Sequence, residues 1–103
     1  IAITGEVDCV SSKDKNYYIA NGHKILSEIT GTGCMCSSLI GSFCGAESDY
    51  LMAAVAGIAS MGIAGEIAYE KTKNLGIGSF KASLMDSIYN LDLNIYKERS
   101  KIY

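Results

Sequence analysis

Ile29-Thr30-Gly31-Thr32-Gly33-Cys34 is the stretch at which the pattern of the chain changes from strand-like to helix-like. Its two glycines predict a turn, because glycine adopts backbone conformations that other residues avoid. Beyond it, apolar side chains recur at the three- and four-residue spacing of one helix face. They are Met35, Leu39, Ile40 and Phe43. We therefore expect a glycine-rich turn followed by a helix that runs from Cys34 to about Gly45.

The residues before this turn are expected to form short β-strands. Four runs rich in apolar, β-branched or aromatic side chains are separated by polar or glycine-containing segments, which is typical of strands and their turns. The runs are Ile1–Thr4, Val7–Val10, Tyr17–Ala20 and Ile25–Ile29. Asn21-Gly22 predicts a tight turn between the last two runs, because both residues tolerate positive φ.

The residues after the first helix are expected to form two more helices. Ser48 and Asp49 are both candidate N-caps of a long helix over about Tyr50–Lys73, and a last helix is expected from Ser79 to about Leu91. The charged tail after Asn94 is expected to be solvated or frayed. Small side chains over Ala53–Ala68 offer more close-packing surface than this segment is expected to cover, so we expect that helix to pack also against residues outside it.

Length and composition limit the class of protein. The chain has 103 residues, 49% of them hydrophobic, and a formal net charge of −2. It is one domain at most, too apolar for a disordered chain, and without the excess of basic side chains that a duplex-DNA binder needs. The uncharged run Tyr50–Gly65 is shorter than the roughly twenty residues that a bilayer requires, so we interpret it as a buried helix. Because a strand-like run opens at Ile1, we interpret the chain as a segment of a longer protein.

The four cysteines predict neither a metal site nor a disulfide framework. Zinc sites usually offer paired C-x-x-C knuckles or a Cys/His set, whereas Cys34 and Cys36 are two residues apart, roughly 200° apart around a helix. His23 is the one histidine, and we expect it to be a turn or packing residue. A reducing cytosol is the expected setting, in which buried thiols act as small hydrophobic groups.

The start of the first predicted helix is also the strongest candidate for chemistry. N–H groups in the first turn of a helix have no intrahelical acceptor, and glycine lets them approach an anion closely. Gly31 and Gly33 therefore indicate either an anion-binding cradle or a plain strand-to-helix turn. Cys34 would lie in the same turn, where the helix dipole favours its thiolate. It is either a candidate proton acceptor or a buried, inert thiol.

Four groups of residues resemble successive motifs of one enzyme family, hydroxyethylthiazole kinase. They are Ile3–Asp8, Asn21–His23, Thr30–Cys34, and the Gly76–Phe80 loop with the helix after it. They extend over nearly the whole chain in the same order, and Thr30–Cys34 is the most specific of them. The resemblance implies a ribokinase-like α/β fold with three layers, αβα. It implies that residues 1–103 are the C-terminal part of a single kinase domain whose N-terminal part is absent, with strands and a hairpin first and three helices after them.

The resemblance also implies a reaction and the residues that serve it. ATP would phosphorylate the hydroxyethyl group of 4-methyl-5-(2-hydroxyethyl)thiazole, in thiamine biosynthesis or salvage. By the same resemblance the anion hole is formed by Gly31, Thr32 and Gly33 with the Cys34 amide, and Gly31 also binds the thiazole. Cys34 would be the catalytic base, and Thr4 would contact ATP. The resemblance further implies a homotrimer that uses Mg²⁺, and the reducing cytosol expected from the cysteines implies a cytoplasmic enzyme.

Two departures from the family pattern are visible: Lys24 and Ile77 stand where the family usually has proline. No magnesium ligand can be assigned in this chain, because the family's metal-binding carboxylates lie in its N-terminal part. Among the carboxylates present, we interpret Asp8 as hairpin surface and Glu66 as structural, while Glu6 stays open.

Three alternatives remain open from the sequence. The chain could belong to a kinase of the same fold that acts on another small alcohol, or it could be a non-catalytic assembly module. It could also be a thiol redox protein that uses Cys34 and Cys36, although two helical residues so spaced are poorly oriented for a disulfide. The expected partners are ATP and a small thiazole alcohol, with neither nucleic acid nor membrane. We expect the isolated segment to be inactive.

Overall fold

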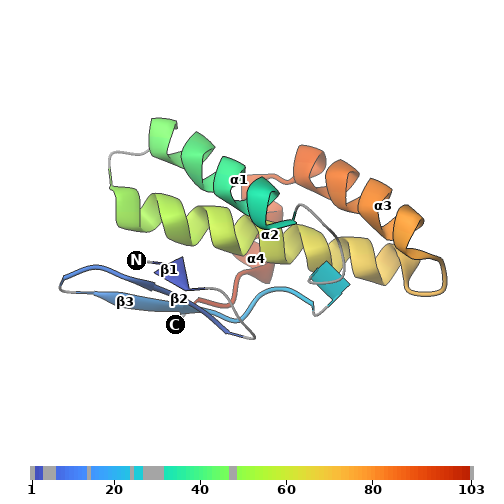
Figure 1. The fold of residues 1–103 in the computed structure, drawn as a ribbon, viewed down its shortest axis with the longest axis horizontal. Helices are drawn as coiled ribbons and strands as arrows, with labels where there is room; N and C mark the ends of the chain where they lie inside the picture. The colour runs from blue at the N-terminus through green and yellow to red at the C-terminus, as the bar shows by residue number, and fades with distance from the viewer. Residues whose placement is uncertain are drawn as a thin grey trace.

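The computed structural model describes residues 2–3, 7–13, 15–23, 25–26, 32–46 and 49–102, and for residues 3, 32–34 and 46 it describes the backbone alone. Within these residues, three short strands come first and four helices follow (Figure 1). The strands are β1 (Ala2–Ile3), β2 (Asp8–Ser11) and β3 (Asn16–Ile19). The helices are α1 (Thr32–Ala46), α2 (Tyr50–Thr72), α3 (Ile77–Asn90) and α4 (Leu93–Arg99).

The strands form an antiparallel sheet in the order β1-β2-β3. Val10 of β2 pairs with Tyr17 of β3. Because side chains alternate between the two faces of a strand, Val10 and Ile19 share the face that is buried against α2, whereas Tyr18 lies on the other face and is exposed. The two longer predicted strands are therefore confirmed, each with its ends moved by one residue.

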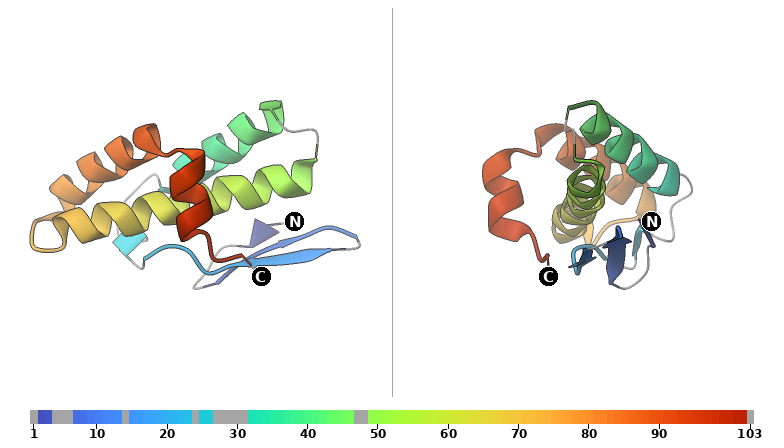
Figure 2. Two further views of the ribbon diagram at one scale, coloured as in Figure 1. Left: turned by 180° about the vertical axis from the view of Figure 1, so that it is seen from behind. Right: turned by 90° about the vertical axis from the view of Figure 1, so that its left-hand side faces the viewer.

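Helix α2 is the central element of the chain. The sheet lies on one side of it and α1 and α3 on the other, with α4 on its flank (Figures 1 and 2). Its small side chains over Ala53–Ala68 are mostly buried within this chain. The expectation that they pack against residues outside the segment was wrong, because the chain's own sheet, α1 and α3 cover them.

By length and composition α2 could cross a membrane. However, 67% of its most apolar 18-residue stretch is buried inside the protein. This agrees with the interpretation of Tyr50–Gly65 as a buried helix, which is the place where long apolar helices of folded domains are found. Of the two predicted caps, Asp49 caps the amino end of α2, because its carboxylate accepts hydrogen bonds from the amides of Leu51 and Met52.

The core divides into two clusters on the two sides of α2. The cluster between α2 and α3 is formed by Met61, Ala64, Ala68, Phe80 and Leu84. The cluster between α2 and the sheet is formed by Val10, Ile19, Val55, Ile58 and Ala59. Cys36 of α1 packs against both clusters, so α1 is joined to the core on each side of α2.

The predicted strand over Ile25–Ile29 was wrong where the structure describes it. Ile25 and Leu26 form one turn of 3₁₀ helix, and the amide of Leu26 donates a hydrogen bond to the carbonyl of His23 at 3.1 Å. Both side chains pack against the α2–α3 cluster, which two consecutive residues of a strand could not do together. Residues 27–29 lie outside the described residues.

The carboxyl end also differs from the prediction of three helices and a frayed tail. A fourth helix, α4, follows α3, because the Asp92 carboxylate caps it by accepting a 2.8 Å hydrogen bond from the Ile95 amide. After α4 the chain returns to the sheet, where the amide of Ala20 donates to the carbonyl of Lys101 at 2.8 Å. Ile102 forms a bridge with Ile19 and packs against the α2–sheet cluster.

Candidate functional site

The amino end of α1 is the part of the predicted anion cradle that the structure describes. The helix begins at Thr32, two residues before the predicted start, so Thr32, Gly33 and Cys34 form its first turn. By helix geometry their N–H groups have no acceptor within the helix, and the helix dipole places a partial positive charge there. Such an end can bind an anion. Gly31 and Thr4, the other predicted site residues, and the side chains of Thr32 and Cys34 lie outside the described residues.

Close packing against α2 fixes the position of α1. A Cβ atom at Gly57 would lie 2.6 Å from Cγ1 of Ile40 and 2.9 Å from its Cα and N, so the two helix backbones touch at this point. Nearer to the amino end, Met35, Cys36 and Leu39 pack against the α2–α3 cluster. Helices α1 and α2 are therefore so close at this point that a methyl group would not fit between them. This contact holds the first turn of α1 in place relative to α2.

Cys36 lies in the second turn of α1 and is half-buried. Burial raises the pKa of the Cys36 thiol, and the carboxylate of Asp8 raises it further. The thiol is therefore protonated at neutral pH, which argues against the redox alternative with Cys34. Asp8 itself is half-buried, on the strand face that also carries Val10. Its interpretation as hairpin surface was wrong, because strand alternation turns it inward.

The segment Asn21–His23, called the turn below, is attached to α2 by hydrogen bonds to Glu66. It does not close the predicted hairpin, because Ile25 and Leu26 after it form no strand. The side-chain amide of Asn21 donates to Oε1 and Oε2 of Glu66 at 3.2 and 3.4 Å, and the backbone amide of Gly22 donates to Oε2 at 3.0 Å. Gly22 has a φ of +124°, which favours glycine. Glu66 is thus structural, as predicted, since its carboxylate serves the N–H groups of this turn.

Asn21 also binds the carboxyl-terminal tail, Arg99–Ile102. Its Nδ2 donates to the carbonyl oxygen of Arg99 at 2.8 Å, and its Oδ1 accepts from the amide of Lys101 at 2.7 Å. The Asn21 side chain is buried, where every polar group needs a partner. One amide side chain therefore joins three parts of the chain: the turn, α2 and the tail.

His23 has contacts typical of a turn residue. Its Nδ1 accepts a hydrogen bond from the amide of Ile25 at 3.2 Å, so the proton of the neutral ring lies on Nε2. Its ring stacks on that of Tyr69, with centroids 3.8 Å apart and planes inclined by 16°. These contacts agree with the expectation of a turn or packing residue.

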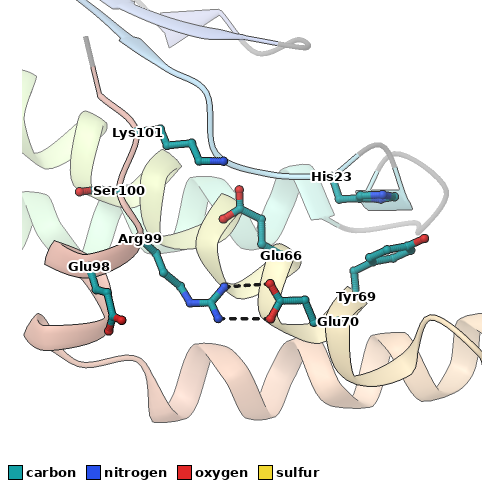
Figure 3. Close-up of a pocket in the computed structure, with 8 residues that line it drawn as sticks. All are labelled: His23, Glu66, Tyr69, Glu70, Glu98, Arg99, Ser100 and Lys101. Atoms are coloured by element: carbon teal, nitrogen blue, oxygen red, sulfur yellow. Dashed lines mark hydrogen bonds and ion pairs between the residues drawn. The ribbon is translucent and has the colours of Figure 1, made fainter.

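A hollow of about 450 Å³ lies between α2, the turn and the tail (Figure 3). Its lining is mostly charged or aromatic and consists of His23, Glu66, Tyr69, Glu70, Glu98, Arg99, Ser100 and Lys101. Arg99 and Glu70 form a bidentate ion pair, with both N···O distances 3.2 Å. The hydrogen bonds from Arg99 lower the pKa of the Glu70 carboxyl. The tail that lines the hollow follows α4, and α4 and α1 lie on different sides of α2 (Figure 2).

The sequence did not predict the hydrogen bonds of Asn21 or the ordered tail. A signal for them exists in Glu66, which is the first charged side chain after sixteen uncharged residues of an apolar helix. A carboxylate in such a place needs hydrogen-bond donors, because an unpaired buried charge is costly. Nothing in the sequence indicates that the donors come from residues 21 and 22.

The family sequence model described as HK, the Hydroxyethylthiazole kinase family, matches residues 1–94. Among curated proteins, the hydroxyethylthiazole kinase of Clostridium tetani (strain Massachusetts / E88) is 57% identical over the whole chain. That of Clostridium botulinum (strain Eklund 17B / Type B) is 51% identical over 99% of it. The chain spans only 38% and 37% of these two proteins, so it corresponds to less than half of each.

Among solved structures, the hydroxyethylthiazole kinase protein from Pyrococcus horikoshii OT3 resembles this chain with a TM-score of 0.91. The two are 37% identical, and the match covers 99% of this chain and 39% of the other. This likeness confirms the expected α/β fold.

Proposed function

The chain belongs to the hydroxyethylthiazole kinase family, and from this premise we propose that it is the part of such a kinase that binds the transferring phosphoryl group. The acceptor would be the hydroxyethyl group of 4-methyl-5-(2-hydroxyethyl)thiazole and the donor ATP. The observation that carries the proposal is the start of α1 at Thr32, which puts Thr32, Gly33 and Cys34 into a first helical turn. These residues belong to the motif that is most specific in the resemblance.

In the proposed reaction the hydroxyl oxygen of the thiazole alcohol attacks the γ-phosphorus of ATP. A P–O bond to the alcohol forms, the bond to the β-phosphate oxygen breaks, and ADP leaves. The hydroxyl proton passes to the thiolate of Cys34, which acts as general base. Charge on the moving phosphoryl oxygens is stabilised by the backbone amides of Gly31, Thr32, Gly33 and Cys34. Thr4 contacts ATP, and Gly31 also contacts the thiazole.

The resemblance implies Mg²⁺ as well, which in phosphoryl transfer is held by carboxylates and phosphate oxygens. The described residues do not fit it, since they bring together no three His, Cys, Asp or Glu side chains that could hold a metal. Of the acidic residues considered, Glu66 is engaged with Asn21 and Gly22. Following the resemblance, we place the magnesium ligands in the N-terminal part of the kinase and derive no step through the ion.

The homotrimer that the resemblance implies and the cytoplasmic setting inferred from the cysteines stay predictions. So do the two alternatives of a kinase for another small alcohol and a non-catalytic assembly module. All of them concern the whole protein, of which the relatives suggest that this chain is a part.

The proposal is tested on the full-length protein that carries this chain, with ATP, Mg²⁺ and a panel of small alcohols. We expect ADP release and a phosphate ester with the hydroxyethylthiazole, and a kcat/KM at least tenfold higher than with other vitamin precursors or sugars. Preference for another alcohol would replace the substrate but retain the phosphoryl transfer. If no alcohol of the panel leads to ADP release, the assembly module is favoured.

A further inference from the structure

We propose that the carboxyl-terminal tail, Arg99–Ile102, positions the phosphoryl-binding first turn of α1, and that it does so through the buried side chain of Asn21. This inference rests on the proposed function. It assigns a role to a segment beyond residue 94, where the family match ends. The tail, the Asn21–His23 turn and α2 meet at the Asn21 amide.

The first link joins the tail to the turn. Asn21 is 5% exposed, and its amide group has a partner for each polar hydrogen and for its oxygen. Rotating the amide by 180° would turn its oxygen toward two acceptors and its NH₂ group toward the Lys101 amide donor. One orientation is therefore strongly preferred, because a buried group without its hydrogen bond costs more than the bond itself gains.

The second link joins the turn to α2. A Cβ atom at Gly62 would lie 2.7 Å from the backbone C and O of Asn21, so the turn rests directly on the α2 backbone. One helical turn further along, the Glu66 carboxylate accepts from the Gly22 amide. Contact at two successive turns of one helix fixes both the position and the direction of the residues that follow.

The third link joins these residues to α1. A Cβ atom at Gly65 would lie 2.7 Å from Cδ1 of Leu26, so the Leu26 side chain lies close against α2. Leu26 packs against the same α2–α3 cluster as Met35 and Cys36, which follow the first turn of α1 directly. A shift of the turn moves Leu26, and α1 must then repack at the end where the phosphoryl group would bind.

The tail could alternatively stabilise the fold without affecting the site. The two roles differ in what they predict. A purely stabilising tail lowers the melting temperature when it is damaged, but it leaves the kcat of the folded enzyme unchanged. A positioning tail changes kcat in fully folded enzyme, because charge on the phosphoryl oxygens must be met by donors that are already in place.

The experiment compares Lys101→Pro with Lys101→Ala in the full-length kinase. Proline removes the backbone N–H that donates to Asn21, while alanine keeps it, and both remove the same charged side chain. Ser100 precedes this position with φ −66° and ψ 136°, the conformation that a residue before proline prefers. The pair therefore isolates one hydrogen bond.

Two readouts are taken well below the melting temperature of each variant: kcat with the KM for ATP, and hydrogen exchange of the Thr32–Ile40 amides. Losing one neutral hydrogen bond corresponds to a change of about two- to tenfold. We expect Lys101→Pro to lower kcat and to speed exchange at the start of α1 by such a factor, with the KM for ATP within about twofold. Lys101→Ala should match the unsubstituted enzyme in both.

A second variant, ending the chain at Ser100, removes the Lys101 donor together with the Lys101 carbonyl and Ile102, so it should lower kcat and speed exchange at least as much as Lys101→Pro does. Unchanged kcat and unchanged exchange in both variants would overturn the positioning role, even if both melt earlier. If the unsubstituted enzyme does not phosphorylate the thiazole, the proposed function fails. The exchange readout then decides the inference alone: faster exchange at Thr32–Ile40 supports it, and unchanged exchange overturns it.

Discussion

Gly57 of α2 and Ile40 of α1 are in backbone contact, so closely that a Cβ atom at Gly57 would lie 2.9 Å from the Ile40 nitrogen and Cα. We predict that Gly57→Ala lowers the free energy of unfolding by about 1–3 kcal/mol, because the obstructing atoms are backbone and the two helices must separate. Urea unfolding of the full-length protein measures it.

Gly41→Ala is the matched control, because Gly41 also lies in a helix but a Cβ there meets nothing within 4 Å. We expect it to raise the free energy of unfolding by about 0.5–1 kcal/mol, through the higher helix propensity of alanine. If Gly57→Ala were as stabilising as Gly41→Ala, the close approach of the two helices would be incorrect.

The hydrogen bonds between Asn21 and Glu66 predict a rescue by a double substitution. Asn21→Asp alone places two carboxylates side by side. Glu66→Gln alone can satisfy only one of the two donors: its NH₂ group faces either the Asn21 NH₂ group or the Gly22 amide, which then lacks its acceptor. Each should lower the free energy of unfolding by about 1–3 kcal/mol. In the double variant the NH₂ group of the introduced glutamine can donate to the introduced carboxylate, and the glutamine oxygen can accept from Gly22.

We expect the double variant to be more stable than the sum of the two single changes predicts, by at least about 0.5 kcal/mol, which a double-mutant cycle measures. The rescue should stay incomplete, because an aspartate at position 21 cannot donate to the Arg99 carbonyl. Strict additivity of the two changes would show that these side chains do not interact.

How much the sequence predicted depends on the distance between interacting residues along the chain. The strand containing Val10 and the helix capped by Asp49 follow from patterns within a few residues, and both were predicted. The tail was predicted to fray because it is charged, and its order was missed because its anchor, Asn21, is 80 positions from Lys101. At the candidate site, the helix start near Cys34 was predicted, whereas the contacts that hold that helix in place come from Gly57 on another helix.

Asp8 and Cys36 predict a pH-dependent reactivity. Burial and the Asp8 carboxylate both raise the pKa of the Cys36 thiol. Its alkylation by iodoacetamide should therefore be slow at neutral pH, and the rate should rise only above the pH range in which an ordinary cysteine thiol ionises. Asp8→Asn removes the carboxylate and lowers this pKa, although burial continues to hold it up. We therefore expect Cys36 to react about two- to fivefold faster at pH 8 in Asp8→Asn, which peptide mass spectrometry measures.

Cys44, in the last turns of the same helix, is the internal control, and its rate should be the same in both proteins. The raised pKa also affects stability. Unfolding returns Cys36 to its ordinary pKa. The stability that the protonated thiol contributes is therefore complete at pH values below that ordinary pKa, and it is lost as the pH rises through the raised pKa of the folded protein. An alkylation rate that Asp8→Asn leaves unchanged would show that the carboxylate does not act on Cys36.

The proposed proton transfer depends on Cys34, which would be the general base in the first turn of α1. Cys34→Ala should lower kcat of the full-length kinase by about 10²- to 10⁴-fold, the usual contribution of general-base catalysis, with the KM for ATP little changed. Cys34→Asp should retain or raise kcat, since a carboxylate can accept the same proton. Cys44→Ala, at the far end of the helix, should leave kcat unaltered. If Cys34→Ala retained full kcat, the proton would go elsewhere, and the first turn of α1 would serve phosphoryl transfer through its backbone amides alone.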